Sequence, residues 1–154
     1  MRILLQRVSS ARVEVEGKTI GAVERGLLLL VGVHQRSLPV HAVTLAQKCA
    51  ELRIFPDAEG KMNLSAKDLG LGALVISQFT LYGDTRKGRR PNFMDAARPE
   101  LAIPLYESFV HQLRQHLPKV ETGQFGATMQ VHLVNDGPVT ILLEAELDFT
   151  APAE

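Results

Sequence analysis

The stretch MQVHLVNDGPVTILLE, residues 129–144, decides how the C-terminal part of this chain folds. Two apolar runs, 129–134 and 139–147, flank the hexapeptide Asn135–Thr140. Asp-Gly between apolar runs is a strong hairpin signal, because glycine adopts positive φ and aspartate bonds its own backbone. Pro138 lacks a donor for the ladder, so it belongs at a strand start, an edge or a bulge, and a Gly-Pro bond can be cis at modest cost. The stretch therefore predicts a final hairpin, and its turn is either a simple reversal or a device that presents rigid carbonyls.

Short apolar patterns predict the remaining strands. The N-terminal residues alternate between apolar and polar, which is typical of a half-buried strand, and a Gly17-Lys18 turn follows. Two later runs are apolar without interruption and only seven residues long, which favours buried strands over helices. The predicted strands cover residues 3–15, 19–24, 27–33, 73–79, 128–134 and 139–147.

Two segments show helical periodicity. Ser37 is the candidate N-cap of a first amphipathic helix, whose apolar stripe includes Cys49 as a small core residue. A second helix is predicted over 99–117, with Pro104 delaying its start or bending its first turn. The two stripes are Ala42, Leu45, Ala46, Cys49 and Leu52, and Leu101, Leu105, Phe109, Leu113 and Leu117.

These elements predict a mixed α/β fold of the α+β type. Strands outnumber helices and most are linked as hairpins, so we expect a largely antiparallel, curved, barrel-like sheet with two main helices packed on it. Residues 1–149 should form a single domain, and residues 150–154 a frayed tail.

The composition narrows the class of partner. The chain has 154 residues, of which 45% are hydrophobic and 22% charged, and its 17 basic and 17 acidic residues cancel. Any electrostatic site must therefore be local. The single cysteine fits a reducing compartment, and no apolar run is long enough to span a bilayer, so we expect a cytoplasmic protein without a membrane partner.

The sequence contains no familiar catalytic or metal-binding motif. Its histidines lack suitable spacing for a metal, and His41, His111 and His116 are predicted to lie at the surface. There is neither a nucleophile elbow nor a phosphate loop. We therefore expect no metal and no cofactor.

Two segments nevertheless carry unusual polar groups. Ser77, Gln78 and Thr80 emerge at the end of a buried strand, where they either line a pocket or simply cap the strand. Shortly afterwards comes a loop with four basic residues in five, which predicts either phosphate contacts or an ordinary solvated loop. The basic residues are Arg86, Lys87, Arg89 and Arg90.

These stretches together resemble the D-aminoacyl-tRNA deacylase family over essentially the whole chain. The resemblance is carried by five motifs in the right order, and the SQFTL and NDGPVT motifs are the most specific. The five are Arg2–Val8, Asp57–Leu64, Ser77–Leu81, Arg89–Phe93 and Asn135–Thr140.

The resemblance implies a homodimeric hydrolase with active sites at the subunit interface. It would cleave the ester joining a D-amino acid, or glycine, to the 3′ end of tRNA. Gly137-Pro138 looks like the cis Gly-Pro pair that one subunit inserts into the other's site to exclude L side chains, with Arg7 holding it in place. Met129 and Asn135 would also serve substrate binding and chiral selection, while Ser77, Gln78, Phe79 and Thr80 would form the catalytic pocket.

The sequence motifs allow two catalytic mechanisms. Thr80 is a candidate nucleophile, yet no His or Lys in the matching motifs can activate it. We therefore favour assistance by the terminal 2′-hydroxyl of the tRNA, with backbone N–H groups near Phe79 and Thr80 stabilising the oxyanion.

Three other functions compete with this one. The main alternative is a non-catalytic nucleic-acid-binding module, for which the basic loop would serve equally well. A related deacylase that removes L-alanine carries different motifs, and a purely structural role does not explain a Gly-Pro pair in a chain with such a pocket strand.

Overall fold

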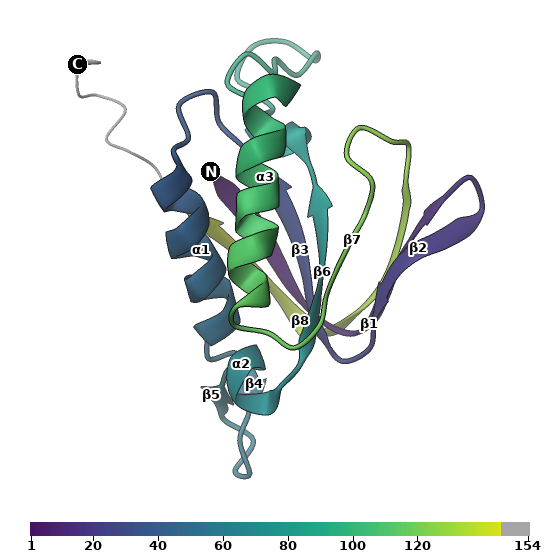
Figure 1. The fold of residues 1–154 in the computed structure, drawn as a ribbon, viewed down its shortest axis with the longest axis vertical. Helices are drawn as coiled ribbons and strands as arrows, with labels where there is room; N and C mark the ends of the chain where they lie inside the picture. Colours follow the sequence, from purple (N-terminus) through teal and green to yellow (C-terminus); the bar gives the residue numbers. More distant parts are fainter. Residues whose placement is uncertain (146–154) are drawn as a thin grey trace.

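The computed structural model describes residues 1–145, which form a strongly curved sheet with two long helices side by side on one face (Figure 1). The mixed α/β prediction with two main helices is confirmed. The strands are β1 Arg2–Val15, β2 Lys18–Val23, β3 Gly26–Gly32, β4 Phe55–Pro56, β5 Met62–Leu64, β6 Gly72–Ser77, β7 Val120–Thr122 and β8 Gln130–Glu144. The helices are α1 Pro39–Glu51, α2 Ala66–Leu69 and α3 Pro99–Arg114, with a 3-10 turn at Phe79–Tyr82.

Strand β1 organises the sheet. One of its edges pairs antiparallel with β8, and the other pairs antiparallel with β3 and, further along, with β2. Beyond β3 the sheet continues through β6 to β7, and both of these pairings are parallel. Helices α1 and α3 lie in the crossovers that such parallel pairings need. The prediction of a largely antiparallel sheet therefore holds for the pairings of β1 and not for those of β6.

The sheet curves until its two ends almost meet. A Cβ on Gly21 in β2 would lie 2.7 Å from the carbonyl oxygen of Thr122 in β7, so side chains cannot separate the strands there. The barrel-like prediction is therefore correct.

Strands β3 and β6 are buried on both faces, which explains their uninterrupted apolar sequences. Leu27 and Leu29 face a core shared with the helices, whereas Leu28 packs with Leu74 and Ile76 on the inner side of the curved sheet.

The start of α1 differs from the prediction. Leu38 is the N-cap, and the Ser37 hydroxyl instead accepts the N–H of His34. His41, predicted at the surface, is buried, because its Nδ1 accepts the Leu38 N–H at 2.9 Å and so completes the first turn.

Two further details concern the helices. The segment 57–71 contains the short helix α2, which Ser65 and Asp68 cap through reciprocal side-chain-to-backbone bonds. Helix α3 begins at Pro99 with Pro104 inside it and ends at Arg114, three residues before the predicted end.

The predicted final hairpin is wrong. Residues 130–144 form one strand, β8, that follows β1 along its length. Val8 pairs with Asn135 and Gln6 with Thr140, so residues 136–139 all lie opposite Arg7 alone. Asp-Gly-Pro therefore makes a bulge in a continuous strand, which we call the Gly-Pro loop (residues 136–139). The predicted strand end at 146–147 and the tail 150–154 lie outside the described residues.

Candidate functional site

A cavity of about 600 Å³ opens where the parallel strands β3 and β6 end. This is the edge at which α/β sheets usually bind ligands, because loops diverge there. The N-terminal end of α3 and the loop before β8 complete the walls. The lining residues are Val31, Val33, Ile76, Ser77, Gln78, Phe79, Phe93, Ala96, Ala97, Pro99, Ala102, Phe125, Gly126, Ala127, Met129 and Val131.

The SQFT segment forms one wall of this cavity. Strand β6 ends at Ser77, two residues earlier than predicted, and the chain enters the 3-10 turn at Phe79. Phe79 is 55% exposed and packs edge-to-face on Phe93, with ring centroids 5.2 Å apart. Ser77, Gln78 and Phe79 therefore reach the cavity as predicted, whereas Thr80 does not line it.

Thr80 has no catalytic partner in the described structure. Its side chain is exposed, and its hydroxyl accepts a hydrogen bond from the Gln78 amide. Within residues 1–145, the backbone N–H groups of Phe79 and Thr80 have no hydrogen-bond partner, as expected for the first turn of a helix. The turn thus offers two main-chain donors beside the cavity.

The cavity is uncharged. None of its lining residues has an ionisable side chain, and residues 1–145 contain no cluster of three or more groups suited to a metal.

The Gly-Pro loop is held by two side chains. Asn135 closes it internally, since its Oδ1 accepts the Val139 N–H at 2.8 Å and its Nδ2 donates to the Val139 carbonyl at 3.1 Å. The peptide bond between Gly137 and Pro138 is cis, as the resemblance implied, and both residues are exposed. The loop is thus a defined projection.

Arg7 fixes the base of this projection. Its Nε donates to the Asp136 carbonyl at 2.8 Å, and its Nη1 donates to the Ile54 carbonyl at 2.6 Å. The Asp136 carboxylate lies 3.5 Å from the same Nε. Arg7, which is only 12% exposed, thereby ties the loop to the segment before β4.

The structure divides the predicted site into two groups. Met129 lines the cavity with the SQF residues, whereas Arg7, Asn135, Gly137 and Pro138 do not touch it. The second group forms the projection instead.

The basic loop lies near the cavity, at the N-terminal end of α3 (Figure 1). The guanidinium of Arg86 forks onto Asp84, and these hydrogen bonds lower the pKa of that carboxyl to about 2. Lys87, Arg89 and Arg90 are exposed and have no ion-pair partner within the described part of the chain. Of the four predicted phosphate ligands, three are therefore available to an anion.

Sequence reasoning missed the far wall of the cavity. Phe93, Phe125 and Ala127 come from loops with no apolar periodicity, and only their packing brings them together. Phe93 ends the motif Arg89–Phe93. An aromatic residue in an otherwise polar loop was the one sequence signal that could have indicated this wall.

Comparison with known proteins is informative over nearly the whole chain. A model of the D-Tyr-tRNA(Tyr) deacylase family matches residues 4–144. A D-aminoacyl-tRNA deacylase of Halalkalibacterium halodurans is 57% identical over 146 residues, covering 95% of this chain and 100% of that protein. One of Koribacter versatilis is 58% identical over 149 residues, covering 97% and 100%.

A solved structure shows the same architecture. The protein described as c-Myc DNA Unwinding Element Binding Protein superposes with a TM-score of 0.90 at 39% identity, covering 96% of this chain and 100% of that one.

Proposed function

Because the chain belongs to the D-Tyr-tRNA(Tyr) deacylase family, we propose that the uncharged cavity is where it hydrolyses D-aminoacyl-tRNA. The protein is a hydrolase of the ester bond between the amino acid and the tRNA. The observation that carries this function is the full-length match to deacylases at more than half identity. We place the reaction in the cytoplasm within one deacylase domain, residues 1–149. None of the helices in residues 1–145 is long and apolar enough to cross a membrane.

We infer that catalysis relies on the main chain and on the RNA. The N–H groups of Phe79 and Thr80 bind the ester oxygen as it becomes an oxyanion. Water adds to the carbonyl carbon, and the neighbouring 2′-hydroxyl of the terminal adenosine assists removal of its proton. The bond to the ribose 3′-oxygen then breaks, that oxygen takes the proton, and the free amino acid leaves. An uncharged cavity supports this scheme, because it offers no side chain to act as a base.

Chiral selection is assigned to the Gly-Pro loop of a second subunit. The loop is exposed, lies outside its own chain's cavity and is braced by Asn135 and Arg7. Strand β8 also carries the exposed apolar side chains of Val131, Leu133, Val134 and Leu142, which suit an interface between subunits. Main-chain atoms inserted into the partner's cavity would exclude an L side chain sterically and admit glycine.

Three substrates test the proposal. D-Tyr-tRNA should be hydrolysed and L-Tyr-tRNA spared, and D-Tyr-tRNA ending in 2′-deoxyadenosine should be nearly inert. Release of free amino acid from each is the measurement. Normal turnover of the 2′-deoxy substrate contradicts RNA assistance, and equal rates for both enantiomers contradict chiral selection.

Thr80→Ala separates the two catalytic readings. We expect the variant to keep kcat within about threefold of wild type, because removing a group that does not enter the transition state costs little. A loss of about three orders of magnitude in kcat with unchanged binding would identify Thr80 as the nucleophile.

A second candidate function is nucleic-acid binding without catalysis. It is favoured by the likeness to the protein described as a DNA unwinding element binding protein and by the charges of Lys87, Arg89 and Arg90, which have no ion-pair partner among residues 1–145. Gel shifts with duplex and single-stranded DNA test it. Tight, salt-dependent binding by a preparation that leaves D-Tyr-tRNA intact would favour this candidate.

A further inference from the structure

A second hollow of about 660 Å³ opens directly beside the cavity. We call it the side groove. Two residues, Phe93 and Ala96, line both spaces, so a bound chain can pass from one to the other across their common wall. The side groove is lined by Gln35, Phe93, Met94, Ala96, Arg98 and Leu101.

The side groove combines an apolar floor with a cation. Phe93, Met94 and Leu101 are exposed by 38%, 77% and 37%, which is unusual for large apolar side chains. Nucleic-acid bases stack on such surfaces, aromatic ones above all. Arg98 is exposed and has no ion-pair partner within residues 1–145. The side groove can therefore take a base and an adjoining phosphate together.

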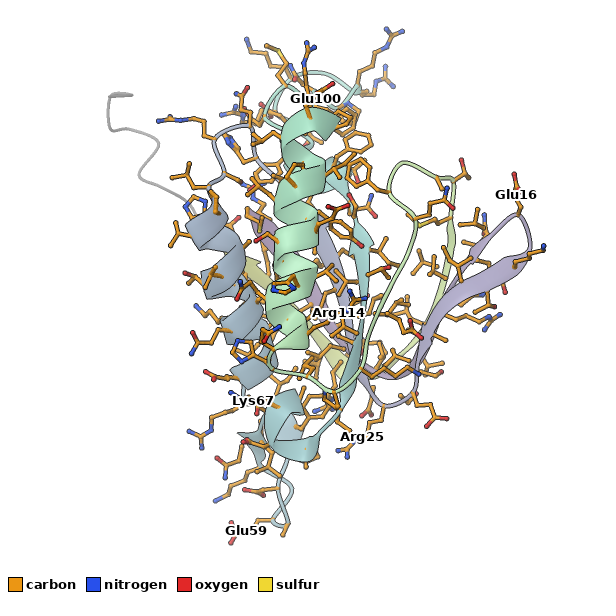
Figure 2. The ribbon with its side chains drawn as sticks, in the orientation of Figure 1. Glu16, Arg25, Glu59, Lys67, Glu100 and Arg114 are labelled. Carbon is orange, nitrogen blue, oxygen red and sulfur yellow. The ribbon has the colours of Figure 1, made fainter. Side chains whose placement is uncertain are left out.

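The charges around the side groove favour an anionic ligand on balance. Arg89 and Arg90 belong to the adjacent basic loop, whose ends are paired through Asp84 and Asn92. Two carboxylates also lie near the side groove. Asp95 is close enough to contribute to the raised pKa of Arg86, and Glu100 lies in the first turn of α3. Figure 2 shows Glu100 at the end of α3 where many nitrogen-tipped side chains gather.

The groove wall is preformed. The segment carrying Arg98 is fixed to the residues that follow β3, since Gln35 N–H donates to the Asp95 carbonyl at 2.9 Å and Ala97 N–H donates to the Val33 carbonyl at 2.8 Å. Little ordering is then required on binding.

Two other hollows adjoin the cavity but suit an RNA strand less well. One shares Phe125 and is bordered by Glu107 and by Arg114, whose guanidinium donates to the Val120 carbonyl. The other shares Val131, and its Arg12 is paired with Glu14. Among the described residues, neither hollow combines a cation that lacks an ion-pair partner with an exposed aromatic ring.

We propose that the side groove binds the nucleotide that precedes the terminal adenosine of the tRNA. Its base stacks on Phe93 and Met94, and Arg98 contacts the phosphate that joins it to the adenosine. The assignment rests on the proposed deacylase function, which brings the aminoacyl-adenosine into the cavity and so directs the preceding nucleotide outward.

Two minimal substrates test this assignment. D-tyrosyl-adenosine fills only the cavity, whereas D-tyrosyl-cytidylyl-adenosine adds one phosphate and one base. The measured quantity is the ratio of their kcat/KM values. We expect wild type to prefer the dinucleotide by about tenfold, the size of one stacked base or phosphate contact. Arg98→Ala should lower this ratio to near one, and Met94→Ser should lower it partly.

Lys48→Ala is the matched control. It removes one exposed positive charge from α1, away from the side groove, and should keep the wild-type ratio. A wild-type ratio near one, or equal ratios in Arg98→Ala and Lys48→Ala, overturns the assignment. Arg98→Gln, which keeps a polar side chain of similar reach, guards against a folding artefact in the alanine variant.

Binding distinguishes failure of the groove from failure of the function. Calorimetric affinities of cytidylyl-adenosine and adenosine for wild type and Arg98→Ala require no hydrolysis. A dinucleotide preference that Arg98→Ala abolishes supports the groove even if neither ester is cleaved, in which case the deacylase function itself fails. No preference in wild type refutes the groove in either case.

Discussion

Asn135 and Arg7 replace the ladder bonds that β8 loses at its bulge. The side-chain amide of Asn135 satisfies both backbone groups of Val139, and Arg7 takes the Asp136 carbonyl. A planar guanidinium suits this task, because its fork reaches two carbonyls at once. At the residue scale, the position of the Gly-Pro loop depends on these two side chains.

Arg7→Lys should therefore be severe although it keeps the charge. A lysine ammonium cannot reproduce the fork to Asp136 and Ile54, so the Gly-Pro loop shifts and kcat/KM on D-Tyr-tRNA falls by about 100-fold. Arg12→Lys, on the same strand at an exposed position, is the control and should stay near wild type. Wild-type kinetics in Arg7→Lys would show that the loop does not need this anchor.

Cys49 should be inert in the folded protein. Burial raises the pKa of its thiol to about 12, so almost no thiolate exists near neutral pH. We expect iodoacetamide to leave the folded protein unlabelled at pH 8 and to label it fully in guanidinium, as mass spectrometry would show.

The same pKa shift has a consequence for alkaline stability. The pKa of the Cys49 thiol is higher in the folded than in the unfolded protein. The contribution of the protonated thiol to the free energy of unfolding is therefore complete below pH 9 and is lost as the pH rises toward 12. Rapid labelling under native conditions would contradict both expectations.

At the scale of elements, α3 shows how far a four-residue repeat can be trusted. An α-helix has 3.6 residues per turn, so a strict repeat of four drifts off the buried face. Phe109 and Leu113 are fully buried, whereas Leu101 at the start of the repeat is 37% exposed. The stripe identified the helix and four of its five members as core residues, since Leu105 and Leu117 are buried as well; only Leu101, in the first turn, is exposed.

Phe109→Ala should destabilise the protein by about 3–5 kcal/mol, because it leaves a large cavity between α3 and the sheet. Leu101→Ala, on the same helix, should cost less than about 1 kcal/mol. Urea unfolding monitored by circular dichroism measures both. Equal losses would mean that the core does not distinguish the two positions.

The sequence predicts individual elements better than their connections. Periodicity predicts strands β1, β2, β3 and β6 and both long helices, because burial on one or two faces gives each of them a regular pattern of apolar residues. The bulge in β8 does not, because Asp-Gly is equally suited to a hairpin and only the register against β1 decides. The parallel pairing of β6 also depends on long-range contacts that no local pattern encodes.

At the scale of the whole molecule, the predicted site residues fall into two places in one chain. The SQF residues and Met129 share the cavity, as their strand ends suggest, while Gly137 and Pro138 stand elsewhere. The resemblance assigned all of these residues to one active site, because a sequence motif indicates what a residue does and not where it lies in the folded chain. The proposed second subunit would bring the Gly-Pro loop of one chain to the cavity of the other.

Mixing two inactive variants tests that arrangement. Arg7→Ala impairs the Gly-Pro loop, and Ala127→Trp fills the cavity. In a random mixture, half of the dimers are mixed and each has one intact cavity facing one intact loop, so activity should recover to about a quarter of wild type. Light scattering should show a dimer, and circular dichroism should confirm that both variants fold. No recovery after subunit exchange would mean that each loop serves its own chain.

The uncharged cavity has a further consequence for how the rate responds to its surroundings. Enzymes that use a side-chain acid and base have a bell-shaped pH profile, whose limbs report those groups. No lining residue here can titrate, so kcat/KM should change monotonically between pH 5 and 9, following the substrate's own ester chemistry. The ratio of D to L hydrolysis should stay constant over the same range, since a steric boundary has no protonation state. The preference for D-aminoacyl-tRNA would then be independent of pH even though kcat/KM is not.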